Sequence, residues 1–147
     1  MGSARHTLSA MTYAADVTPT QAYAAVTGPE RGVLVDVRTR AEWAYVGVPE
    51  VPETAPALLL IEWQNYPDGT RNAGFVDALR AAGIEAGRPL YFLCRSGARS
   101  QGAASAATAA GLGPAYNILD GFEGPLDAAG HRLVAGWKNI GLPWRQG

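Results

Sequence analysis

The stretch from Pro89 to Gly111 constrains the fold of this chain more than any other. It starts with a short apolar, aromatic run over 89–93, which predicts a buried strand. An Ala-rich segment over 98–110 follows and predicts a helix that Gly111 closes. Cys94 lies between them, so we expect it where a strand ends and a helix begins, in a loop whose amide groups turn inward.

This loop carries the chemistry that we predict for the chain. Helix N-termini and neighbouring arginines favour the thiolate form of a cysteine, and the thiolate is the nucleophile. We therefore predict that Cys94 is the catalytic nucleophile. The loop residues that we expect to bind an anionic substrate are Arg95, Ser96, Gly97, Ala98, Arg99 and Ser100. The alternative interpretation is a buried cysteine that acts as a small apolar side chain, the commoner fate of a single cysteine.

Length and composition indicate one folded domain. The 147 residues are 48% apolar and 17% charged, with a net charge of -1, which argues against a basic nucleic-acid surface. The single cysteine forms no intrachain disulfide, and a free reactive thiol predicts a reducing, cytoplasmic location. We expect no metal, since there is no His/Cys cluster, and no membrane span, since the longest apolar run covers only 55–61.

The order of predicted elements indicates an α/β fold. Residues 1–15 lack a clear period and are expected to form a loose arm, whereas 16–147 form the domain. The expected strands are 16–17, 32–37, 57–61, 89–93 and 115–119. The expected helices are 19–26, a segment from Asn72 to near Gly83, and 98–110, with a short helix or turn at 136–140. We expect a polar segment over 38–42 that leads into a loop with Gly47, Pro49 and Pro52, and another loop over 62–71.

Strands that alternate with helices predict a mainly parallel five-stranded sheet with helices on both faces. Such sheets bind ligands at the carboxyl ends of their strands, where Cys94, Asp36 and Asp120 all fall. We expect Asp36 and Arg38 to form a hydrogen-bonded pair that supports the loop, and Asp120 to stabilise a turn.

With these residues in view, the chain resembles the rhodanese family, as a single-domain rhodanese-like protein, from about Val17 to Trp144. The resemblance rests on 34–38 followed by Glu42-Trp43, on the loop 94–100, on 119–124, and on 136–137 with 141–144. One departure is visible at 46–51, which reads Val-Gly-Val-Pro-Glu-Val where many members have Gly-His-Ile-Pro-Gly-Ala. The glycine and the proline remain, but the histidine is absent.

The resemblance implies a sulfurtransferase of the thiosulfate sulfurtransferase class. Such an enzyme moves sulfane sulfur from a donor such as thiosulfate, through a Cys94 persulfide, to an acceptor such as cyanide or a thiol. It needs no cofactor. Its partners are a small sulfur donor and an external acceptor, either a small thiol or a protein, rather than nucleic acid or a membrane. The acceptor must be external because the chain has no second cysteine.

Other functions remain open for the same fold. One is a persulfide carrier, sensor or binding module without turnover. Another is a Cys-dependent phosphatase or arsenate reductase, whose loops place five residues between cysteine and arginine. Here four residues separate Cys94 from Arg99, which favours a sulfur atom over a tetrahedral oxyanion. The sequence leaves donor and acceptor undetermined, because rim loops such as Glu62 to Arg71 would shape specificity.

Overall fold

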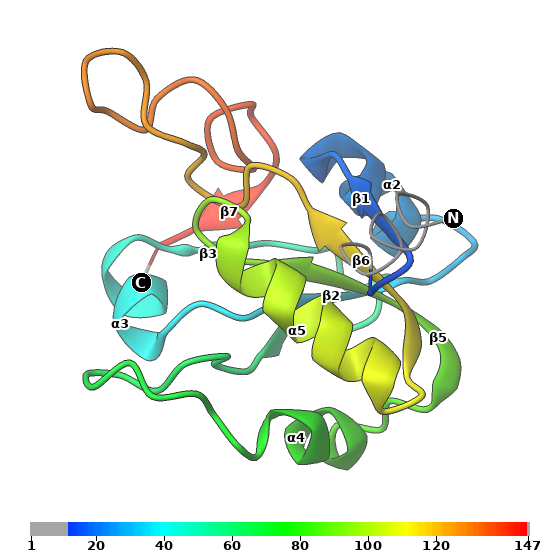
Figure 1. Ribbon diagram of the computed structural model, residues 1–147. Coiled ribbons are helices and arrows are strands. Elements are labelled where there is room, and N and C mark those ends of the chain that lie inside the picture. Colours follow the sequence, from blue (N-terminus) through cyan, green and yellow to red (C-terminus); the bar gives the residue numbers. More distant parts are fainter. Residues whose placement is uncertain (1–11, 147) are drawn as a thin grey trace, which may run out of the picture.

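The computed structural model describes residues 12–146 and is built around one parallel sheet (Figure 1). The strand order is β1-β6-β5-β2-β4, and every neighbouring pair is parallel. In that order the strands are Ala15–Val17, Gly113–Ile118, Ala86–Leu93, Val33–Asp36 and Leu59–Leu60. A small antiparallel pair joins β3 (Val48–Pro49) to β7 (Trp144–Arg145). The predicted parallel five-stranded sheet is confirmed.

Helices cover both faces of this sheet, as predicted. They are α2 (Pro19–Thr27), α3 (Arg40–Tyr45), α4 (Phe75–Ala81) and α5 (Ala98–Ala109). Side chains of β2 and β5 alternate between two cores, because successive residues of a strand point to opposite faces. Val35 and Phe92 pack in the core that contains α4 and α5 residues, whereas Leu34 packs with α2 and the buried Trp137 near the C-terminus.

The Ala-rich α5 lies close to the sheet because its inward side chains are small. Ala103, Ala104 and Ala107 of α5 are fully buried. Gly102 faces the Trp63 ring so closely that a Cβ atom there would lie 3.0 Å from the ring. Small residues on this helix therefore determine how closely α5, and with it the start of the helix at Ala98, approaches the sheet.

The segment after β2 differs from the prediction. Arg40–Tyr45 is the helix α3, whereas the predicted elements include no helix between residues 38 and 52. Thr39 is its N-cap, and the Thr39 and Glu42 side chains bind each other's backbone amides in a capping box. The Thr-x-x-Glu signature of such a box is present in the sequence at 39–42, within the segment that we predict only as polar.

Other boundaries differ as well, among them those of β4 and α4. Instead of a buried strand over 57–61, the structure has the two-residue edge strand β4, in which Leu60 is 43% exposed. The N-cap of α4 is Gly74 rather than Asn72, whose side-chain oxygen accepts a hydrogen bond from the Gly74 amide. The predicted turn at 136–140 is present, and the loop over 62–71 is present apart from a single bridge.

The packed body begins before the predicted boundary at residue 16. Tyr13 is buried in the core, and the Ala14 amide donates to Ala115 O at 2.8 Å. Residues 1–11 of the predicted N-terminal arm lie outside the described residues. Within 12–146, no helix is long and apolar enough to cross a bilayer.

Candidate active site

Cys94 directly follows β5 and lies between that strand and α5, as predicted. It is 1% exposed, but polar groups surround its sulfur. The Gly97 amide donates to Cys94 Sγ at 3.0 Å, and Ser100 Oγ lies 3.2 Å from the same sulfur. Gly97 is the N-cap of α5 with φ +121°, a conformation that a glycine allows, and no side chain caps the helix. The sulfur therefore faces the positive end of a helix.

The segment 121–124 holds the carbonyl groups of the cysteine loop. The Phe122 amide donates to Cys94 O at 2.7 Å, and the Glu123 and Gly124 amides donate to Arg95 O at 3.0 and 3.2 Å. A Cβ atom on Gly121 would lie 2.4 Å from Cys94 O, so only glycine fits this approach. These bonds fix the backbone on either side of Cys94 and Arg95, and the Gly97 amide further along the loop donates to the sulfur. The sequence marked this segment but not its role.

The prediction that Arg99 binds an anion would require a free guanidinium. In the structure, this guanidinium is paired with Glu42. Its two terminal nitrogens bind Glu42 Oε1 at 2.6 Å and Oε2 at 2.9 Å, a contact with α3. Burial opposes ionisation of Glu42, but the Arg99 and Thr39 hydrogen bonds outweigh it and lower the pKa of Glu42 to about 2. Burial alone would lower the pKa of Arg99, yet Glu42 and the nearby Cys94 raise it. The pair braces α5 against α3.

The other predicted anion-binding residues divide into two groups. Gly97 and Ser100 are buried and contact the sulfur, whereas Arg95, Ser96 and Ala98 are exposed. The loop thus has a polar floor and an exposed rim.

Asp36 and Arg38 form the expected hydrogen-bonded pair and are both fully buried. Arg38 binds the Asp36 carboxylate through Nε and one terminal nitrogen, the latter at 2.7 Å, and this nitrogen also donates to Gly47 O. The guanidinium lies over the Phe122 ring at 4.2 Å from its centroid. The pair therefore links the end of β2 to Gly47 and to the segment that holds the cysteine loop.

A polar chain behind the sulfur was not predicted. Ser100 Oγ donates to Asn117 Oδ1, and Asn117 Nδ2 donates to Asp16 Oδ1 at 2.9 Å. Asp16 and Asn117 are register partners on β1 and β6, which brings residues from distant parts of the chain together. Only the pairing of these strands reveals the contact.

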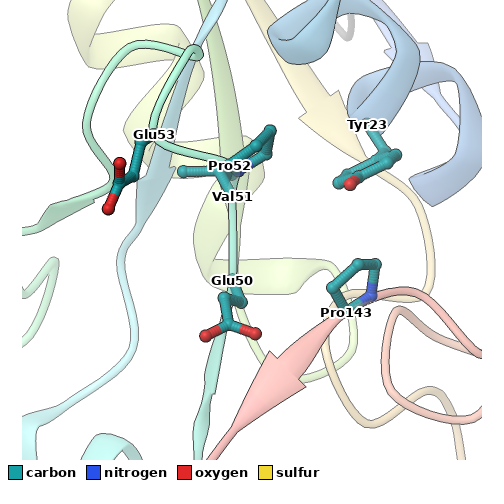
Figure 2. Close-up of a pocket in the computed structure, with 6 residues that line it drawn as sticks. All are labelled: Tyr23, Glu50, Val51, Pro52, Glu53 and Pro143. Atoms are coloured by element: carbon teal, nitrogen blue, oxygen red, sulfur yellow. The ribbon is translucent and has the colours of Figure 1, made fainter.

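One cavity lies away from the cysteine. Its volume is about 350 Å³. Figure 2 shows the residues that line it, which are Tyr23, Glu50, Val51, Pro52, Glu53 and Pro143. None of its lining residues belongs to 94–100, so it is not the cysteine site. Across 12–146, no group of three or more His, Cys, Asp or Glu side chains is arranged to hold a metal.

Comparisons with known proteins agree with this architecture. The crystal structure of Rv0390 from M. tuberculosis superimposes with a TM-score of 0.83 at 53% identity, over 92% of this chain and 99% of that one. The polysulfide-sulfur transferase homodimer of Wolinella succinogenes gives 0.64 at 18% identity, over 98% of this chain and 86% of that one. The rhodanese-like domain protein of Staphylococcus aureus gives 0.58 at 18% identity, over 91% and 99%. No family model matches the chain.

The parallel sheet, the helices on both of its faces and the cysteine loop between β5 and α5 define a rhodanese-like domain fold. The chain belongs to the same family as Rv0390 and as the RP600 homologue of Rickettsia rickettsii. The latter is 36% identical over 132 residues, which cover 88% of this chain and 96% of the rickettsial protein.

Proposed function

We propose that this protein is a sulfurtransferase that carries sulfane sulfur on Cys94. The observation that carries the proposal is the placement of Cys94 Sγ at the uncapped N-terminus of α5, 3.0 Å from the Gly97 nitrogen. Backbone donors that are already oriented stabilise developing negative charge, by about 3 kcal/mol per donor in other enzymes. The name of the Wolinella protein, a polysulfide-sulfur transferase, supports the same class of chemistry.

The proposed reaction has two displacements. The Cys94 thiolate attacks the outer sulfur of thiosulfate, the sulfur–sulfur bond breaks, and sulfite leaves with the bonding electron pair. The product is a Cys94 persulfide whose terminal sulfur carries the negative charge. Cyanide, or a thiolate from a small molecule or a protein, then attacks this terminal sulfur and releases the Cys94 thiolate.

The roles of the surrounding residues follow from their contacts. Gly97 and the first amides of α5 would hold the anionic sulfur, and the exposed Arg95 and Ser96 would meet the incoming donor at the rim. Arg99 would contribute its backbone amide, because its guanidinium is bound to Glu42. The loop 62–71 begins beside the end of β2, where the Trp63 amide donates to Val37 O, and we assign it to the acceptor-facing rim.

Mass spectrometry after incubation with thiosulfate tests the proposal. We expect one added sulfur atom on Cys94, and none on Cys94→Ser, a matched control because it leaves the chain without any thiol. Addition of cyanide should then remove the sulfur and yield thiocyanate. Persulfide formation without transfer would indicate a carrier or sensor, and release of phosphate from an aryl phosphate would indicate a phosphatase. No sulfur uptake from any sulfane donor would refute the proposal.

A further inference from the structure

The chain of hydrogen bonds behind Cys94 ends in a carboxylate at the edge of the sheet. Ser100 and Asn117 are both fully buried, so no solvent replaces their partners. Asn117 Nδ2 donates to Asp16 Oδ1 at 2.9 Å, and Tyr13 OH donates to the same oxygen at 2.8 Å. Burial and Asp16 raise the pKa of Tyr13 to about 12, so Tyr13 remains a donor near neutral pH.

Asp16 determines the orientation of the Asn117 amide. An ionised carboxylate only accepts hydrogen bonds, so Asn117 must turn its NH₂ group to Asp16 and its carbonyl oxygen to Ser100. The reverse orientation would place two acceptor oxygens against each other. As long as Asp16 is ionised, Ser100 therefore faces an acceptor on this side.

The Ser100 hydroxyl has one proton and three acceptors around it. These are Asn117 Oδ1, Gly97 O at 3.1 Å and Cys94 Sγ at 3.2 Å, of which Asn117 Oδ1 is closest. With the proton on the Asn117 side, Ser100 turns a lone pair to the sulfur and accepts from a Cys94 S–H group. A thiolate would instead accept a hydrogen bond from the Ser100 hydroxyl. If the hydroxyl donated to the sulfur, the buried Asn117 oxygen would be left without a donor.

We infer that Asp16, acting through Asn117 and Ser100, is a positioning residue that withholds the Ser100 proton from Cys94 and favours the thiol in the free protein. The other charged groups near the sulfur are the same whether Ser100 donates to Asn117 or to Cys94. Arg99 is paired with Glu42, and the Asp36–Arg38 pair is internally neutral. The inference rests on the proposed function only for its consequence, which is that thiolate formation is a controlled step of sulfur transfer.

The test measures the reactivity of Cys94 toward iodoacetamide across pH, which requires no sulfur transfer. In Asp16→Asn, residue 16 no longer forces the Asn117 orientation, so the Asn117 amide can donate to Ser100 and free its hydroxyl for the sulfur. We expect alkylation below the midpoint of the pH profile to become about tenfold faster, the size of one hydrogen bond to an anion. The profile itself should move to lower pH.

A second background separates this mechanism from the simple loss of a negative charge. In Ser100→Ala the effect of Asp16→Asn should vanish, because no hydroxyl is left to reorient. Asp120→Asn is the matched control, because it removes another acidic group, at a residue whose backbone lies near Gly97 and which takes no part in these hydrogen bonds. The effect of Asp120→Asn should be the same with and without Ser100. Circular dichroism verifies that each variant is folded.

Two results would overturn the inference. One is an Asp16→Asn effect of equal size in the Ser100→Ala background, which would show a through-space charge effect. The other is an unchanged pH profile in folded Asp16→Asn. Neither result depends on thiosulfate, so this inference can fail while Cys94 still takes up sulfur, and the reverse outcome is equally distinguishable.

Discussion

The ion pair between Glu42 and Arg99 allows a quantitative test of how the cysteine loop is braced. Both side chains are about one-fifth exposed, at 19% and 20%. The informative change is Glu42→Gln. Glutamine is the alternative residue at this position of a capping box, so it preserves the N-cap of α3 at Thr39 while removing the negative charge.

The expected magnitude follows from the pKa of Glu42. A carboxyl group whose pKa falls from 4.5 on its own to about 2 in the folded protein gains about 3 kcal/mol of stability from ionisation. Solvent screening of a partly exposed pair reduces this to about 1–2 kcal/mol. Because the folded pKa is depressed, the contribution is fully present above pH 4.5 and is lost as the pH falls toward 2.

Urea denaturation followed by tryptophan fluorescence measures this contribution. We expect Glu42→Gln to be less stable than the wild type by about 1–2 kcal/mol at neutral pH, and the difference to shrink by more than half near about pH 3. Asp77→Asn, an exposed carboxylate on α4, serves as the control and should change stability little. A Glu42→Gln penalty that stays constant from neutral to acid pH would refute the assignment of an ionic brace.

Two further changes test the supports of the loop. Gly121→Ala should lower the free energy of unfolding by more than about 2 kcal/mol and abolish sulfur uptake. The reason is that its Cβ atom would lie 2.4 Å from Cys94 O, at a backbone φ of +58°. Gly69→Ala, at φ +74° with no atom within 4 Å, should lose only about 1 kcal/mol, and equal losses in urea would contradict the close-approach argument. Arg38→Met should cost about 3–5 kcal/mol because it leaves the Asp36 carboxylate buried without its partner. Recovery of most of that stability in the double variant with Asp36→Leu would support this account. An Arg38→Met variant as stable as the wild type would exclude it.

Much of the fold was predictable because it depends on neighbours in sequence. The short, continuous apolar runs at 33–37 and 89–93 indicate central strands, and the caps around α2 lie within a few residues of the helix ends. The position of Cys94 between strand and helix follows from the same local signals. The helix α3 was equally readable from Thr39 and Glu42, and it was missed only because six residues carry little periodicity.

Local sequence patterns could not predict the hydrogen-bond partners of the polar side chains at the site. Arg99 is 57 residues from Glu42, and Asn117 is 101 residues from Asp16, so only the packing of α3 and the pairing of β1 with β6 bring each pair together. An arginine beside a cysteine predicts an anion site equally well whether or not a carboxylate reaches it from another helix. Tertiary contacts decide which.

The sequence alone predicts an α/β fold with the single cysteine just before a helix, because apolar patterns and helix caps depend on residues only a few positions apart. The tertiary structure decided what the cysteine sulfur meets. It turned the carbonyls of Cys94 and Arg95 toward the amides of 122–124, bound Arg99 to a carboxylate, and placed a buried hydroxyl beside the sulfur. Hydrogen bonds and charges act over a few ångströms, and only the folded chain brings these groups within that distance.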